Sequence, residues 1–264
     1  MARYFYILLL SLLLTSCSEF QKALKTDDVK MKYEVAEKLY ENGKYAKAIR
    51  LFEQIAQAYR GKPQAEKMFY MYAQSLYKTE QYYTAGYQFE SFAAGYPRSE
   101  KLEEASFLGA KSYYFLSPVY SLDQVDTYKA IDKLQLFIDK YPNSEYLPEA
   151  NKLVKELREK LEKKAYEIAK QYNTIMDYKA AVKALDNFII DYPGTPYKED
   201  ALFYKYDSSY QLAINSVANK MEERLNLAKA NYAALMKFNS ETKYKKQADE
   251  MLARINTELQ RFSN

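Results

Sequence analysis

The sequence predicts an all-α protein, an α-solenoid of about five helix hairpins. Composition is the first observation, because 264 residues with only 6 Gly and 7 Pro and many Ala, Leu, Lys and Glu favour helix. A recurring motif is the second: Phe-x-x-x-Tyr-Pro-x-[Ser/Thr] occurs at Phe92–Ser99, Phe137–Ser144 and Phe188–Thr195. A fixed helix-turn unit that returns at intervals of tens of residues is typical of an α-solenoid.

Each copy of the motif has a local physical meaning. Phe137 and Tyr141 stand four residues apart and therefore share one helix face. Pro142 disfavours helix for the residue before it, and Ser144 is suited to cap a following helix. The motif therefore predicts the end of one helix, a turn and the start of the next.

The N-terminus predicts a lipoprotein. The apolar stretch Tyr4–Leu14 is too short for a membrane span, which needs about 20 residues, and fits a secretory signal. The following Leu-Thr-Ser-Cys resembles a bacterial lipobox, and Cys17 is the only cysteine. We therefore expect residues 1–16 to be a signal peptide that is removed, and residues 17–28 to be a lipidated tether. A plain signal peptide or an anchor with an incidental cysteine is the alternative.

The location follows from the same segment. Ser18 is not the acidic residue that often retains lipoproteins in the inner membrane. We expect the chain to lie at the periplasmic face of the outer membrane. Fatty acyl chains such as palmitate, carried by Cys17, would anchor it there.

The first repeat is the clearest. Met31–Tyr59 contains two amphipathic stretches on either side of a turn in which Gly43 supplies a left-handed conformation. It resembles a tetratricopeptide repeat, whose signature positions are occupied by Ala36, Tyr45, Ala48 and Phe52.

The later repeats follow with variations, so we expect a tetratricopeptide-repeat solenoid over residues 29–264, with halves at about 29–145 and 146–264. The third repeat has an insertion around Phe115–Thr127, and Pro148–Tyr172 predicts one helix of about 25 residues without Gly or Pro. The fifth repeat is degenerate, and the chain from Lys243 onward reads as a polar closing helix.

Function is expected on the first helices, which line the concave face of such a solenoid. By the tetratricopeptide resemblance, two positions seven residues apart on each first helix point into the groove formed by this concave face. Over five repeats, nine of these ten residues are aromatic, in a chain that is 16% aromatic. Rings with nearby ammonium groups suit an extended peptide, although the same rings could instead pack repeat against repeat. The candidate groove residues are Tyr33, Tyr40, Tyr70, Tyr77, Phe107 and Tyr114, with Lys67, Lys78 and Lys111 beside them.

Catalytic chemistry is not indicated, and we expect no enzyme activity, cofactor or metal. The sequence has no His, a single Cys and no Gly-rich phosphate loop. A net charge of +4 is far from the footprint of a nucleic-acid-binding protein.

As a whole, the chain resembles the BamD family of lipoproteins, which serve the outer-membrane β-barrel assembly machinery. The resemblance rests on the lipobox, five repeats, the insertion, the long helix, and the segments Lys140–Tyr146 and Asp191–Thr195. It implies a periplasmic scaffold that binds unfolded outer-membrane proteins through its N-terminal repeats and BamA, the barrel insertase, through its C-terminal repeats. The alternatives are another periplasmic adaptor, for envelope constriction or peptidoglycan synthesis, and a glycan-binding uptake lipoprotein.

Overall fold

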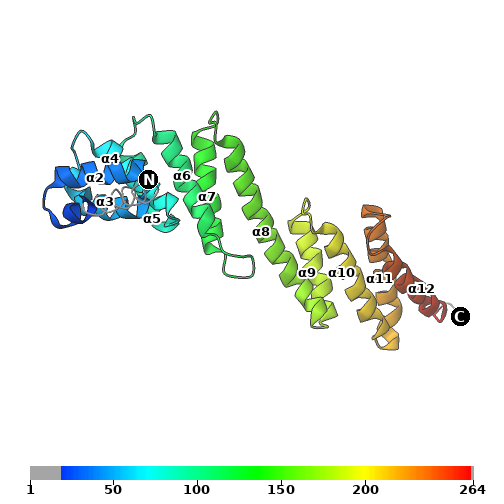
Figure 1. The fold of residues 1–264 in the computed structure, drawn as a ribbon. Helices are drawn as coiled ribbons and strands as arrows, with labels where there is room; N and C mark the ends of the chain where they lie inside the picture. Colours follow the sequence, from blue (N-terminus) through cyan, green and yellow to red (C-terminus); the bar gives the residue numbers. More distant parts are fainter. Residues whose placement is uncertain (1–18, 263–264) are drawn as a thin grey trace, which may run out of the picture. The chain divides into compact units, whose positions relative to one another are not determined.

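The computed structural model describes residues 19–262, and these residues form helices joined by short turns, without any strand. Figure 1 shows their order along the chain. The all-α class and its helix hairpins are therefore confirmed. Cys17 and the predicted signal peptide lie outside the described residues. The helices are α2 (Val29–Glu41), α3 (Tyr45–Tyr59), α4 (Ala65–Lys78), α5 (Tyr82–Gly95), α6 (Leu102–Leu116), α7 (Val125–Lys140), α8 (Leu147–Thr174), α9 (Tyr178–Asp191), α10 (Lys198–Ile214), α11 (Ala218–Phe238) and α12 (Lys245–Gln260).

The first hairpin shows why the sequence folds in this way. The Asp28 side chain caps α2 by accepting hydrogen bonds from the backbone of Lys30 and Met31, at 2.9 and 3.1 Å. Gly43 ends the helix with a φ of +69°, which a residue with a side chain rarely adopts. Ala36 and Ala48 are fully buried, so α2 and α3 approach closely.

The predicted tether is shorter than residues 17–28. Residues 19–25 are helical, and within them Phe20 and Ala23 are buried in the same apolar core as α2 and α3. The ammonium of Lys47 and the guanidinium of Arg50 lie 5.4 and 5.7 Å from the centre of the Phe20 ring. This segment was expected to be a linker, but the burial of Phe20 and Ala23 docks it on the core.

The repeated motif ends helices as predicted. Phe92, Phe137 and Phe188 are buried, and the tyrosine four residues after each one donates its backbone N–H to the carbonyl of that phenylalanine. The role of the serine or threonine differs from the expectation. Ser99, Ser144, Thr195 and Thr242 stand two residues before the helix cap, and each side-chain oxygen accepts from the backbone N–H two residues later, at 3.0–3.3 Å. They hold the turn that leads into the helix rather than capping the helix itself.

The chain divides into two compact units. The first consists of the described residues up to Pro118 together with Leu122–Leu157, and the second of Val119–Ser121 and Arg158 onward. The boundary falls inside α8, later than the expected position near residue 145. Ala150, Leu153, Val154 and Leu157 from the first half of α8 complete the core of α6 and α7, while Tyr166 and Ala169 from its second half join the core beneath α9 and α10.

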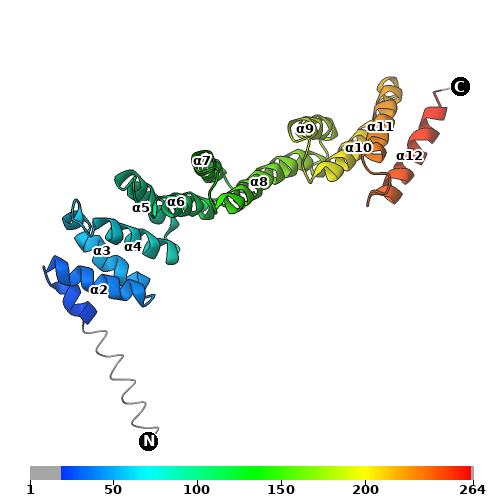
Figure 2. The ribbon, with the colours of Figure 1, turned by 90° about the horizontal axis from the view of Figure 1, so that it is seen from above.

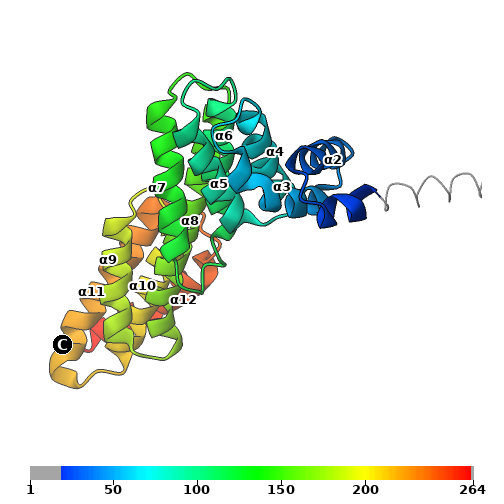
Figure 3. The ribbon, with the colours of Figure 1, turned by 90° about the vertical axis from the view of Figure 1, so that its left-hand side faces the viewer.

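Within the first unit, the hairpins pack in sequence. Helix α3 contacts α4, and α5 contacts α6 (Figure 3), while the first helix α4 also touches the first helices α2 and α6. Helices α5 and α6 approach each other closely, because a Cβ on Gly109 would lie 3.1 Å from the Cβ of Phe89. The first helices of three repeats therefore share one face, where the sequence places the groove.

In the second unit, α10 packs against α9, α11 and α12 (Figure 2). Tyr206 of α10 is fully buried, and its hydroxyl donates a hydrogen bond of 3.0 Å to the carbonyl of Ala248 in α12. The degenerate fifth repeat thus keeps the hairpin arrangement, and α12 closes its core through Ala248, Met251 and Ile255.

Candidate peptide-binding groove

A hollow of about 710 Å³ lies in the first unit, where α2, α4 and the start of α6 come together. Aromatic and apolar side chains line part of it, and charged side chains line the remainder. The lining residues are Tyr40, Glu41, Pro63, Glu66, Lys67, Tyr70, Met71, Gln74, Phe92, Lys101 and Glu104. We call this hollow the groove.

Tyr70 is the central side chain of the groove. Its ring packs against buried Phe92, with the ring centres 5.6 Å apart. The amide of Gln74, itself only 7% exposed, donates to the Tyr70 hydroxyl at 2.8 Å and lies 3.5 Å from Glu104 Oε1. Burial, reinforced by the hydrogen bond with Glu104, holds the pKa of the Tyr70 phenol well above its ordinary value. Tyr70 therefore presents a neutral ring and hydroxyl.

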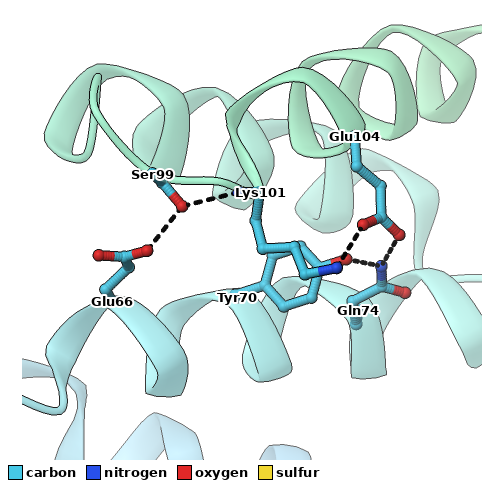
Figure 4. A network of polar contacts seen from close by, with 6 residues as sticks. All are labelled: Glu66, Tyr70, Gln74, Ser99, Lys101 and Glu104. Atoms are coloured by element: carbon cyan, nitrogen blue, oxygen red, sulfur yellow. Dashed lines mark hydrogen bonds and ion pairs between the residues drawn. The ribbon is translucent and has the colours of Figure 1, made fainter. Parts of the chain in front are cut away.

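Figure 4 shows the polar side chains around this ring. The ammonium of Lys101 lies 5.6 Å from the centre of the Tyr70 ring and 3.1 Å from Glu104 Oε2. Ser99, in the turn before α6, donates to Glu66 Oε1 at 2.6 Å and so joins this turn to α4. The polar rim of the groove is thus built from two consecutive repeats.

The charges of the rim are mixed. Glu41, Glu66 and Glu104 oppose Lys67 and Lys101. Lys67 is tied to Glu37 of α2 by an ion pair of 2.5 Å, and this hydrogen bond raises the pKa of the Lys67 ammonium. The rim can therefore bond a peptide backbone and side chains of either sign, with no excess of positive charge to favour anions.

The structure brings together three of the residues that the sequence selected: Tyr40, Lys67 and Tyr70. Tyr40 lies edge-on to Tyr45, with ring centres 5.7 Å apart, and burial raises the pKa of its phenol.

Tyr33 and Phe107 were also expected in the groove but lie in the core, only 8% and 2% exposed. Tyr33 stacks on Tyr59 at 5.1 Å, and Phe107 stacks on Tyr146 at 4.8 Å. The reason is that a neighbouring ring covers each of them, which is the packing alternative that the sequence left open.

Tyr77, Lys111 and Tyr114 form a separate cluster with the first half of α8. Lys111 pairs with Glu149 at 2.7 Å, and the Tyr114 hydroxyl donates to Glu156 at 2.6 Å. Tyr77 packs edge-on against Tyr82, with ring centres 5.6 Å apart. Lys78 is exposed in the last turn of α4 and does not line the groove. Its position there complements the helix dipole.

Sequence reasoning missed Glu66, Gln74, Lys101 and Glu104, because each is an ordinary polar residue when it is considered alone. One signal could have found Lys101. Aligned on the serine of the motif, Lys101 stands where the next copy has Tyr146.

Among residues 19–262, no cluster of three or more His, Cys, Asp or Glu side chains is arranged to hold a metal ion. In that same part of the chain, no helix has the length and apolar character needed to cross a bilayer.

Comparison with known proteins gives one family. The model of the YfiO family, described as outer membrane lipoprotein, matches residues 25–225. Among solved structures, the chain matches the TPR-like repeats of a Podosopora anserina kinesin light chain at 14% identity and a TM-score of 0.32. That match covers 88% of this chain and 97% of the other.

Proposed function

Because the chain belongs to the YfiO family of outer-membrane lipoproteins, we propose that it is a non-catalytic scaffold held at the periplasmic face of the outer membrane by a lipid on Cys17. In this proposal it acts as a BamD protein of the β-barrel assembly machinery. It binds unfolded outer-membrane proteins and the periplasmic domains of a BamA-like insertase. Holding both partners on one anchored chain raises their effective concentration, without covalent chemistry.

The observation that carries the proposal is the groove. The partly exposed ring of Tyr70 offers apolar area at low entropic cost, because Gln74 and Phe92 already fix its position. The carboxylates of the rim can accept hydrogen bonds from the backbone of an extended segment. Client segments rich in aromatic residues suit such a surface.

The partner is tested by affinity purification of the tagged, full-length lipoprotein from membranes in mild detergent. A β-barrel protein with periplasmic repeats should copurify. If it does not, the assembly role is wrong, and a different copurifying envelope protein would favour an adaptor for envelope constriction or peptidoglycan synthesis.

The client site is tested with fluorescent peptides that copy the C-termini of outer-membrane β-barrel proteins. The double variant Tyr40→Ala/Tyr70→Ala should bind at least about tenfold more weakly, because it removes both rings of the groove. The matched control is Tyr83→Ala/Tyr128→Ala, which removes two tyrosines that are 70% and 59% exposed and lie outside the groove. Equal losses in both variants would argue against the groove.

A further inference from the structure

A ring-on-ring stack recurs in the later repeats. In each, a tyrosine two residues after the serine or threonine of the turn lies flat on the aromatic residue of a preceding first helix. Tyr146 stacks on Phe107 at 4.8 Å and 12°, Tyr197 on Tyr166 at 5.3 Å and 8°, and Tyr244 on Phe203 at 3.8 Å and 4°.

The second repeat lacks this covering ring. Lys101 stands two residues after Ser99 and four before Ala105, just as Tyr146 stands two after Ser144 and four before Ala150. The backbone turn is also the same, since Lys101 N–H donates to Ser99 Oγ at 3.0 Å. The position equivalent to Tyr146 is therefore occupied by an ammonium group instead of a ring.

The burial of the ring on the first helix differs in the same way between the repeats. Phe107, Tyr166 and Phe203 are 2%, 4% and 3% exposed, whereas Tyr70 is only partly buried. The Tyr70 ring packs on Phe92 with the ring centres 5.6 Å apart, and the Lys101 ammonium lies 5.6 Å from the centre of the Tyr70 ring. The side chain of Lys101 is itself 54% exposed, so it can leave the ring without opening the core.

We propose that the place above Tyr70 is a subsite for an aromatic side chain of the bound peptide, and that Lys101 is the specificity-determining residue that keeps this place open. The inference rests on the proposed function, because it assigns one contact of the client segment. At the equivalent place in three other repeats, the group that fits is a flat tyrosine ring from the adjacent turn.

When a ring enters, the Lys101 ammonium can leave the Tyr70 ring and stay paired with Glu104. Its ammonium already lies 3.1 Å from Glu104 Oε2, and Glu104 is held by the Gln74 amide. A cation over an exposed ring is weakly held, whereas two rings that stack in a partly enclosed groove also remove apolar surface from water. An incoming Phe or Tyr can thus replace the ammonium while the ion pair to Glu104 persists.

The experiment measures fluorescence anisotropy of two labelled ten-residue peptides with the full-length protein in mild detergent. One peptide copies the aromatic-rich C-terminus of an outer-membrane β-barrel protein, and the other has Leu at each aromatic position. The wild-type protein should bind the aromatic peptide at least about tenfold more tightly than the Leu peptide, because Leu retains apolarity and loses stacking. This comparison requires no variant to fold.

Two substitutions complete the test. In Lys101→Tyr, the new ring should occupy the subsite and lower the affinity for the aromatic peptide about tenfold. The melting temperature should equal or exceed that of the wild type. The matched control is Lys78→Tyr, which adds the same ring at an exposed position outside the groove and should keep the affinity within about threefold of wild type. Unchanged binding by Lys101→Tyr would overturn the inference. Equal binding of both peptides by the wild type would overturn it while sparing the proposed function, and no binding of either peptide would overturn both.

Discussion

The amide of Gln74 donates a hydrogen bond of 2.8 Å to the hydroxyl of Tyr70, one turn earlier on the same helix. The second acceptor of this amide, Glu104, is more distant at 3.5 Å and belongs to the next repeat. A buried amide thus orients the central ring of the groove and links it to α6.

Tyr70→Phe should separate the contribution of the hydroxyl group from that of the aromatic ring. It leaves the buried Gln74 amide with only its weaker acceptor, and this should lower the free energy of unfolding by about 1 kcal/mol. Urea unfolding followed by circular dichroism measures this loss. Peptide affinity should change less than threefold, because the ring remains; a large loss of affinity at unchanged stability would instead assign the hydroxyl to binding.

Gly109 should be intolerant of a large side chain. Because its Cβ position is 3.1 Å from the Cβ of Phe89, Gly109→Leu must push α5 and α6 apart and should cost about 1–3 kcal/mol of stability. The control is Gly95→Ala, where no atom lies within 4 Å of the added Cβ, and which should be neutral or slightly stabilising. Thermal unfolding of both variants makes the comparison, and equal melting temperatures would contradict the close approach.

Tyr114 should make stability depend on alkaline pH. Its hydrogen bond to Glu156, together with burial, raises the pKa of the phenol from 10.0 to about 12. Since the folded-state pKa lies above the unfolded one, the stabilisation is complete below pH 10 and is lost as the pH rises towards 12.

Tyr114→Phe cannot make this contribution. Wild type should therefore be more stable than the variant at pH 8, and the gap should close as the pH approaches 12. Chemical denaturation of both proteins at several pH values gives the two curves. A gap that stays constant with pH would show that the hydroxyl contributes nothing through its ionisation.

Cys17→Ser should abolish lipidation, because Cys17 is the only thiol in the chain. Radioactive palmitate should label the wild-type protein and the Ser18→Ala control but not this variant. Fractionation should find the variant outside the lipid-anchored pool, since the lipid proposed on Cys17 would be lost. Label retained in Cys17→Ser would contradict the predicted lipobox.

Much of the fold is local and was predictable. The Phe-to-Tyr spacing, the proline after it and Gly43 place helix ends within a few residues of those observed, because these signals act over one or two turns. The uninterrupted stripe from Pro148 to Tyr172 likewise predicted α8. The helix of residues 19–25 was missed because its formation depends on the docking of Phe20 into a core formed later in the chain.

The site was only partly predictable. The sequence by itself determined that first helices carry aromatic residues at regular positions, since helical periodicity fixes which residues share a face. Only the tertiary structure decided which of those rings is covered: Tyr146 closes over Phe107, whereas Lys101 leaves Tyr70 accessible. The physical reason is that exposure depends on what the next repeat places above a ring, and that partner is about thirty to forty residues away in the chain.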